Sequence, residues 1–80
     1  MPISSPNSKE PALVAFGAAV RVARTLRGIS QEELAHRCGV DRSYLGAIER
    51  GEQHSGLLHL VRISVALETT LADLTTKAGL

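Results

Sequence analysis

Residues 31–50 constrain the fold of this chain more than any other stretch. Ser30 is followed three residues later by Glu33, and this capping-box spacing predicts a helix that begins at Gln31. Gly39 predicts the end of that helix, because glycine adopts the left-handed conformation of a C-terminal cap without steric cost. A short helix therefore precedes a tight turn.

A second helix follows the turn directly. Asp41 is a good N-cap, so this helix is predicted over residues 42–50. Its apolar Leu45 and Ile48 are expected to face a core, and the small Ala35 of the preceding helix lets the two helices cross closely. Two short helices joined in this way form a helix-turn-helix.

Three more helices are predicted around this motif. The first covers residues 11–27, which start with proline and are rich in alanine, valine and arginine. The next begins at Leu57, after a loop of polar residues and glycine. The last covers residues 71–78, because Thr70 and Asp73 repeat the capping-box spacing. The sequence therefore predicts an all-α fold of five helices.

Apolar residues at helical spacing predict which faces are buried. The inward side of the first helix contains Phe16, Val20, Ala23 and either Leu26 or Arg24. The inward stripe of the helix that begins at Leu57 contains Leu57, Leu60, Ile63 and Leu67. A second stripe on the same helix contains Leu58, Val61 and Val65. This second stripe is more than one small core needs, and its simplest interpretation is a wide buried face.

Length and composition fit one small helical domain. Eighty residues make one domain, and with one Phe, one Tyr and no Trp the core must be built from aliphatic side chains. Residues 1–10 are rich in proline and serine and are predicted to be a flexible tail. The folded helix-turn-helix domain is therefore expected over residues 11–80, with the motif at about residues 31–50.

Cysteine, histidine and charge content narrow the function. A lone Cys38, without a secretory signal or a membrane-spanning apolar run, predicts a protein of the reducing cytoplasm. This cysteine and three histidines lack the spacing of a zinc site, and no nucleophile, histidine and acid pattern occurs, so neither metal, cofactor nor catalysis is expected. The net charge of +1 is too small to argue for nucleic-acid binding by itself.

The sequence resembles the Xre family of helix-turn-helix regulators, which contains the lambdoid phage repressors and Cro. The matching residues are Arg24, Gly28, Ile29, Ser30, Gln31, Glu33, Leu34, Ala35, Gly39, Val40, Tyr44, Leu45, Ile48, Glu49, Arg50, Gly51, Leu57, Leu60, Ile63, Ala66, Leu67, Leu71 and Leu74. The resemblance implies a five-helix, lambda-repressor-like DNA-binding domain. Residues 41–44 and 46–50 are similar to the controller proteins of restriction-modification systems, which act as homodimers. Ser55 stands where the family usually has proline before the fourth helix, and Glu68 where it usually has glycine after that helix. The conformations of these two loops are therefore expected to differ from those usual in the family.

The resemblance implies that the second helix of the motif, at about residues 42–50, enters the DNA major groove. Arg42 is expected to read guanine, because its guanidinium can donate to O6 and N7 together. Further contacts with bases or phosphates are implied for Gln31, Ser43, Tyr44, Ala47, Arg50 and Gln53.

Simpler interpretations stay open for three of these residues. Arg42 can form a local ion pair with its neighbour Asp41, which is worth little on a surface. Tyr44 can be an edge of the core, and Gln31 an ordinary solvated residue in the first turn of its helix. None of these alternatives involves DNA.

Two further sets of residues have structural roles under the resemblance. Arg24 and Glu49 fall on inward positions, and their family counterparts form a partly buried ion pair between two helices. The dimer interface is predicted on the last two helices, through Leu58, Val61, Val65 and Ala72. The competing dimer surface is the outer side of the first helix, around Val14 and Ala18.

We therefore expect a transcriptional regulator that binds double-stranded DNA sequence-specifically as a homodimer on a palindromic operator. The alternative is a protein-interaction module of the same fold, of the antitoxin or coactivator type, which the weak net charge slightly favours. Six arginines favour DNA if they share one face: Arg21, Arg27, Arg37, Arg42, Arg50 and Arg62.

Overall fold

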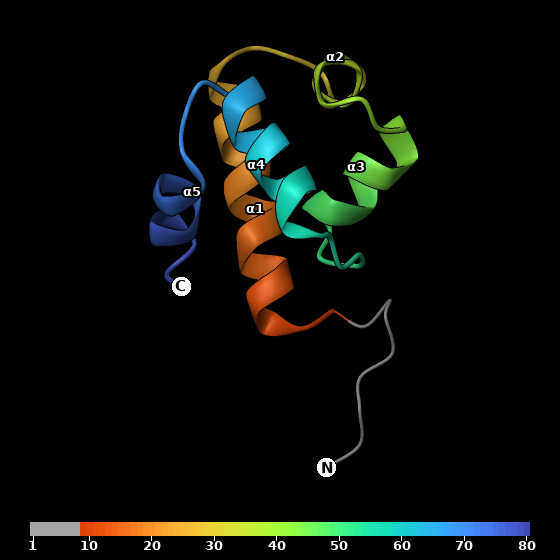
Figure 1. Ribbon diagram of the computed structural model, residues 1–80. Coiled ribbons are helices and arrows are strands. Elements are labelled where there is room, and N and C mark those ends of the chain that lie inside the picture. The colour runs from red at the N-terminus through yellow and green to blue at the C-terminus, as the bar shows by residue number, and fades with distance from the viewer. Residues whose placement is uncertain (1–8) are drawn as a thin grey trace.

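A computed structural model describes residues 9–80 (Figure 1). All five predicted helices are present, and residues 9–80 contain no strand, so the all-α prediction is confirmed. Most of the predicted tail at residues 1–10 lies outside the described residues. The helices are α1 (Pro11–Leu26), α2 (Gln31–Cys38), α3 (Arg42–Glu49), α4 (Leu57–Ala66) and α5 (Leu71–Lys77).

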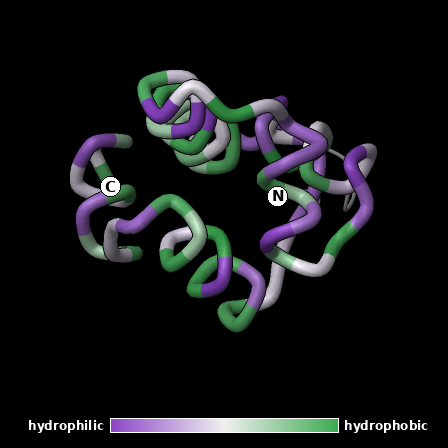
Figure 2. Tube along the Cα trace, turned by 90° about the horizontal axis from the view of Figure 1, so that it is seen from above, coloured by the Kyte–Doolittle hydropathy of each residue, from purple (hydrophilic) through white to green (hydrophobic). Residues whose placement is uncertain are grey.

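The long α1 is the helix on which the others are assembled. It contacts α3 on one side and α5 on the other, while α2 packs on α3 and α4, and α4 packs on α5. Figure 1 accordingly shows α2 and α3 together at one side of the molecule and α5 at the opposite side. Seen from above, hydrophobic residues recur at intervals along the helical trace (Figure 2).

The core is aliphatic with a single aromatic ring. Its buried residues are Phe16, Val20, Leu34, Ala35, Cys38, Leu45, Ile48, Ile63, Leu67 and Leu74. All five helices contribute to this set, so each short helix is held by tertiary packing rather than by its own propensity. Ala35 is 2% exposed, consistent with its predicted place between helices.

Helices α1 and α3 approach each other closely at Gly17, a residue that the sequence did not mark as a contact. A Cβ atom at this position would lie 2.6 Å from the carbonyl oxygen of Glu49 and would also collide with that of Ile48. The two helices therefore meet backbone to backbone at a residue without a side chain. This contact fixes the carboxyl end of α3 against the middle of α1.

Leu57 and Leu26 lie outside the core, although the sequence predicted Leu57 to be buried and offered Leu26 as a candidate for burial. Leu57 was predicted in the inward stripe of α4 but is 67% exposed, because it is the first residue of the helix and precedes the part that reaches the core. Of the two candidates near the end of α1, Leu26 is 81% exposed. Arg24 takes the inward position instead, because its guanidinium bonds with buried Glu49.

The residues predicted to cap the helices occupy the capping positions, but some of their side chains do not form the predicted bonds. The hydroxyl of Ser30 accepts from the amide of Glu33, as the capping box predicts, but the Glu33 carboxylate pairs with Arg37. Asp41 occupies the N-cap of α3 without a side-chain capping bond. The helix of residues 42–50 ends at Glu49, with Arg50 as its C-cap.

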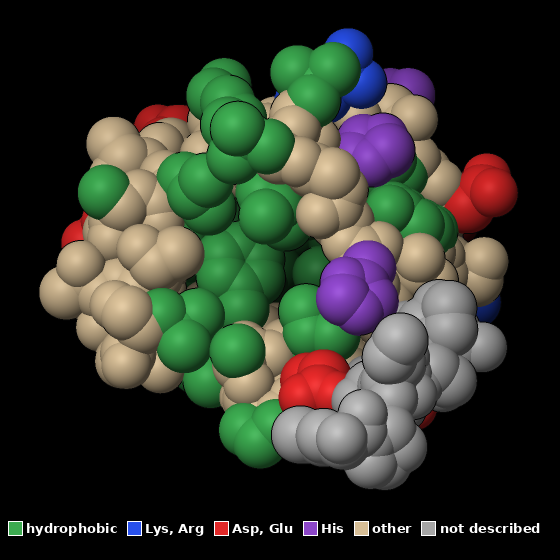
Figure 3. Space-filling model, turned by 60° about the horizontal axis from the view of Figure 1, so that its bottom comes forward, with side chains coloured by type: hydrophobic (Ala, Val, Ile, Leu, Met, Phe, Trp, Pro, Cys, Tyr) green, Lys and Arg blue, Asp and Glu red, His purple; other side chains and the backbone are tan. Residues whose placement is uncertain are grey.

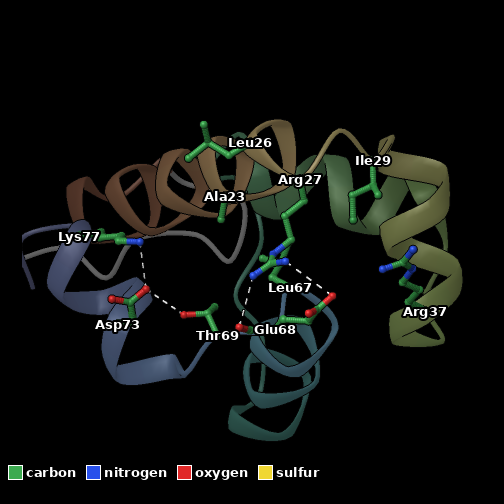
Figure 4. A pocket seen from close by; sticks show the side chains of 10 residues that line it. All are labelled: Ala23, Leu26, Arg27, Ile29, Arg37, Leu67, Glu68, Thr69, Asp73 and Lys77. Atoms are coloured by element: carbon green, nitrogen blue, oxygen red, sulfur yellow. Dashed lines mark hydrogen bonds and ion pairs between the residues drawn. The ribbon is translucent and has the colours of Figure 1, made fainter.

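Glu68 ends the turn after α4 in the left-handed conformation, with φ 57°, and no other non-glycine residue within 9–80 has positive φ. Its carbonyl oxygen accepts from Nη2 of Arg27 at 3.4 Å, and its carboxylate lies 3.6 Å from Nη1 of the same residue. Figure 4 shows these contacts in a groove of about 500 Å³, where Asp73 also bonds with Thr69 and Lys77. The sequence departure from glycine at this position therefore creates a strained turn that is tied to Arg27, the C-cap of α1.

Candidate DNA-binding surface

The turn between α2 and α3 sets the angle at which α3 leaves the domain. Gly39 caps α2 in the left-handed conformation, with φ 73°. The amide of Val40 donates to the carbonyl of Ala35 at 3.0 Å, which satisfies a free carbonyl at the end of α2. The chain then turns directly into α3, as the sequence predicted.

The amino end of α3 carries two side chains that point away from the core. Arg42 and Ser43 are exposed, and neither side chain forms a hydrogen bond or ion pair with another residue in 9–80. The local pair of Arg42 with Asp41 is therefore absent from the described residues. Ala47 is half-buried one turn after Ser43, and exposed Arg50 follows close to the same face.

Gln31 meets this face from the neighbouring helix. It is the first residue of α2 and is half-buried, and its Nε2 donates to Oε1 of Glu49 at 2.9 Å. A Cβ atom on Gly46 would lie 3.6 Å from Oε1 of Gln31 and 3.1 Å from Nη1 of Arg50. The structure thus brings Gln31 and Arg50 together over the bare backbone of Gly46, a residue that the sequence analysis did not assign to the site.

Tyr44 and Gln53 lie apart from this group. The Tyr44 hydroxyl is 3.2 Å from Oγ of Ser55, and its ring makes an edge contact with His59 at 5.5 Å between centroids. This geometry matches the core-edge alternative, while a DNA contact by Tyr44 stays a prediction. Gln53 donates to the carbonyl of His54 in the loop after α3, and it lines a hollow near the amino end of α1.

Arg24 and Glu49 form a two-pronged pair between α1 and α3. Nε of Arg24 lies 2.7 Å from Oε2 of Glu49, and Nη2 lies 3.1 Å from Oε1. The Glu49 side chain is only 2% exposed and the Arg24 side chain 13%. The hydrogen bond with Glu49 raises the pKa of Arg24, although burial opposes the rise. Arg24 also donates to the carbonyl of Ile29, which ties the pair to the loop before α2.

The six arginines divide into paired and unpaired groups. Arg27, Arg37 and Arg50 form ion pairs with Glu68, Glu33 and Glu52, respectively. Arg21, Arg42 and Arg62 have no acidic partner within the described part of the chain. Internal pairing therefore offsets half of this positive charge, and Arg42 is the unpaired arginine on α3.

The outer side of α4 carries an apolar patch. The exposed fractions are 62% for Leu58, 39% for Val61 and 66% for Val65, and Ala72 of α5 is exposed as well.

Figure 3 shows hydrophobic side chains gathered on the lower face of the molecule around a hollow. Leu80, Leu71 and Leu60 line this hollow of about 210 Å³. On α1, Val14 is 41% exposed and Ala18 is exposed, so the competing surface is also accessible.

Other kinds of site have little support in residues 9–80. No group of three or more His, Cys, Asp or Glu side chains in this range converges as metal ligands would. Cys38 is buried, and burial raises the pKa of its thiol. None of the helices in this range combines the length and apolar character that crossing a bilayer requires.

Comparisons with known proteins agree with this geometry. Residues 20–74 match the model of the HTH_3 family, described as helix-turn-helix. Control protein C.SmaI of Serratia marcescens is 39% identical over 61 residues, which are 76% of this chain and 73% of that protein. Control protein C.BamHI of Bacillus amyloliquefaciens is 40% identical over 60 residues, 74% of either chain. The crystal structure of the restriction-modification controller protein C.AhdI from Aeromonas hydrophila matches with a TM-score of 0.79 at 40% identity, covering 81% of this chain and 98% of that one.

Proposed function

Because this chain belongs to the Xre-like HTH_3 family and is a DNA-binding transcriptional regulator, we propose that it binds a palindromic operator as a homodimer with α3 in the major groove. Relatives of the control-protein type suggest a regulator of a restriction-modification system.

The exposed amino end of α3 carries the proposal. Arg42 and Ser43 have no partner within residues 9–80, so their donors are available to DNA. The Arg42 guanidinium can donate to both guanine acceptors, a pairing worth about 1–3 kcal/mol of discrimination against other bases. The half-buried Ala47 would contact a thymine methyl from the same face.

Residues beside α3 are proposed to hold the phosphates. Gln31 stands at the amino end of α2, where unpaired backbone amides favour an anion. Arg50 lies next to it over Gly46. Tyr44 and Gln53 would contact DNA only at the edges of the site, because each side chain already bonds within the protein.

Selection of bound duplexes from a random pool tests the DNA-binding proposal. We expect a palindrome, whose symmetry reports a dimer and whose spacing reports the distance between half-sites. Arg42→Ala should weaken binding to the selected site by about 1–3 kcal/mol and relax the preference at one base pair in each half.

Arg42→Lys is the matched control, because lysine keeps the charge but loses the two-pronged donor geometry. It should keep the salt dependence of wild-type binding and lose the base preference. Arg42→Ala variants that select the same palindrome as the wild type would contradict the assigned role of Arg42.

The dimer is proposed to form through the α4 patch, with Leu58, Val61, Val65 and Ala72 at its centre. Large apolar side chains on one helix face, rimmed by polar residues, are typical of a protein interface. Leu57 extends this patch, since the structure places it outside the core. Sedimentation of Val61→Glu should show a monomer, and Val22→Glu on the outer side of α1 serves as the control. A Val61→Glu protein that sediments as the wild-type dimer would exclude this interface.

A protein-interaction module is the second candidate function. It is favoured by the internal pairing of Arg27, Arg37 and Arg50, which leaves a weak positive surface. Retention on random duplex should fall with salt if DNA is the ligand. Binding that is absent or independent of salt would favour the protein partner.

A further inference from the structure

The carboxylate of Glu49 has two kinds of donor, one structural and one at the DNA-binding surface. Arg24 uses Oε2 at 2.7 Å and shares Oε1 at 3.1 Å. The second donor to Oε1 is Nε2 of Gln31, at 2.9 Å. A buried side chain of α3 therefore holds the first side chain of α2.

This bond decides which end of the Gln31 carboxamide faces outward. A carboxylate only accepts, so Gln31 must turn its nitrogen rather than its oxygen toward Glu49. One Nε2 proton is used in the bond, which leaves one proton and Oε1 for other partners. The free proton can be donated to a phosphate oxygen, the contact proposed above, and together with Oε1 it also matches the N6 and N7 edge of adenine.

Gly46 provides the space for this arrangement. A Cβ atom on it would lie 3.6 Å from Oε1 and 3.8 Å from Nε2 of Gln31, and 3.1 Å from Nη1 of Arg50. The carboxamide and the guanidinium therefore both lie near the α3 backbone at this glycine. A methyl group at position 46 would crowd the guanidinium and touch the carboxamide at ordinary contact distance, and a larger side chain would take the space of both.

We propose that Glu49 and Gly46 are positioning residues for DNA recognition, which orient the Gln31 carboxamide before DNA arrives. Glu49 sets its direction by the Nε2 bond, and Gly46 leaves the room in which it lies. A group oriented in advance loses less conformational freedom on binding. This inference rests on the proposed DNA-binding function.

A double-mutant cycle on duplex affinity tests the inference. Glu49→Gln keeps the side-chain volume but makes Arg24 and Gln31 compete for one acceptor oxygen. Gln31→Met keeps the side-chain length without the amide. We expect Glu49→Gln to weaken binding about tenfold when Gln31 is present and by less than about twofold in the Gln31→Met background, since contacting residues couple. Equal losses in the two backgrounds, or no loss, would overturn the inference.

Arg24→Gln is the matched control for stability. It breaks the same ion pair but leaves Oε1 of Glu49 to hold Gln31. At a temperature where circular dichroism shows every variant folded, this control should bind DNA nearly as the wild type does. A loss as large as that of Glu49→Gln would show that the carboxylate acts through stability alone, against the inference.

Gly46→Ala keeps the inference testable if Glu49→Gln fails to fold. This variant leaves the Arg24 pair intact, and alanine favours a helix over glycine. Its Cβ atom would lie 3.1 Å from Nη1 of Arg50, which must shift by a few tenths of an ångström, and in ordinary contact with Gln31. We therefore expect a loss of DNA binding smaller than that of Glu49→Gln, at an unchanged or higher melting temperature. Unchanged binding would overturn the role assigned to Gly46.

A measurement on the free protein separates this inference from the proposed function. The ¹⁵N heteronuclear NOE of Gln31 Nε2 should be that of a rigid group in the wild type and of a mobile group in Glu49→Gln. If the wild type binds no duplex, the proposed function fails, while this NOE still decides whether Glu49 holds Gln31. A mobile carboxamide in the wild type would refute the inference.

Discussion

Nε of Arg50 lies 2.9 Å from Oε1 of Glu52, so the arginine that follows α3 already has an anionic partner within the protein. Lys9 lies 3.5 Å from the other oxygen of the same carboxylate. A DNA phosphate that binds Arg50 must therefore compete with Glu52. Under the proposal that Arg50 contacts a phosphate, we expect the charge of Glu52 to weaken that contact.

Glu52→Gln is expected to raise the affinity for random duplex and to steepen its salt dependence by about one released ion, because Arg50 then becomes available to a phosphate. Filter binding across a salt series measures both quantities. Glu68→Gln, which removes the partner of Arg27 in the turn after α4, is the control and should leave binding unchanged. Equal effects of the two variants would show that net charge alone is responsible.

The same pair predicts a dependence on pH. The hydrogen bond with Arg50 lowers the pKa of Glu52 from its ordinary value. The pair therefore stabilises the fold at pH above the ordinary glutamate pKa, and this contribution is lost as the pH falls through the lowered value. Wild type and Glu52→Gln should differ in melting temperature near neutral pH and converge on acidification. A constant difference would contradict the ion pair.

Gly17→Ala is expected to destabilise the domain by about 3 kcal/mol or more. An added methylene in a packed core typically costs about 1–3 kcal/mol, and here the new methyl group meets backbone atoms, which yield less than side chains do. The methyl group would lie against the carbonyl oxygens of Ile48 and Glu49. Urea denaturation measures the change in the free energy of unfolding. Ala18→Ser, exposed on the same helix, should change it by no more than about 0.5 kcal/mol.

Glu68→Gly is expected to raise the free energy of unfolding by about 1 kcal/mol, because a left-handed conformation is costly for any residue with a Cβ atom. Glu68→Ala separates backbone from charge, since it removes the ion pair with Arg27 and keeps the strain. This control should be neutral or slightly destabilising, as expected for the loss of an exposed pair. Equal stabilities of the two variants would rule out strain at this turn.

Glu49→Ala is expected to cost about 3–5 kcal/mol, because it leaves the guanidinium of Arg24 buried without its anion. The double variant Arg24→Met with Glu49→Leu should recover much of this loss, since it leaves no charge uncompensated. Thermal denaturation of the single and double variants tests both statements. An unchanged melting temperature of Glu49→Ala would mean that the pair adds nothing to the fold.

Local signals predicted the helices correctly, because caps and turns depend on neighbouring residues. The Ser30 and Thr70 caps and the turn at Gly39 all occur as expected. The helical spacing of apolar residues predicted burial less well at helix ends. Leu57 has the spacing of a buried residue, but it lies at the start of α4 and does not reach the core. The helical phase predicted inward positions for Arg24 and Glu49 and the family resemblance predicted their pairing, and Nε of Arg24 donates to Oε2 of Glu49.

Contacts between residues distant in the sequence were missed. Nothing near Gly17 in the chain indicates that the carbonyl oxygens of α3 pack against it. The bond between Gln31 and Glu49 likewise depends on how α2 and α3 cross. Candidates for contact with DNA could therefore be predicted from the sequence, whereas the residues proposed to orient them could not. Glu52 belongs to the same class, since its role depends on the position that Arg50 takes after α3 ends.

Arg42 and Ser43 have no bonding partner within residues 9–80, and this affects how the DNA preference of such a regulator can change. Neither side chain is bonded within residues 9–80, so replacing them removes no hydrogen bond or ion pair that holds the described fold together. If these two side chains read the operator as proposed, its sequence preference can change by substitutions at positions 42 and 43 with little effect on folding.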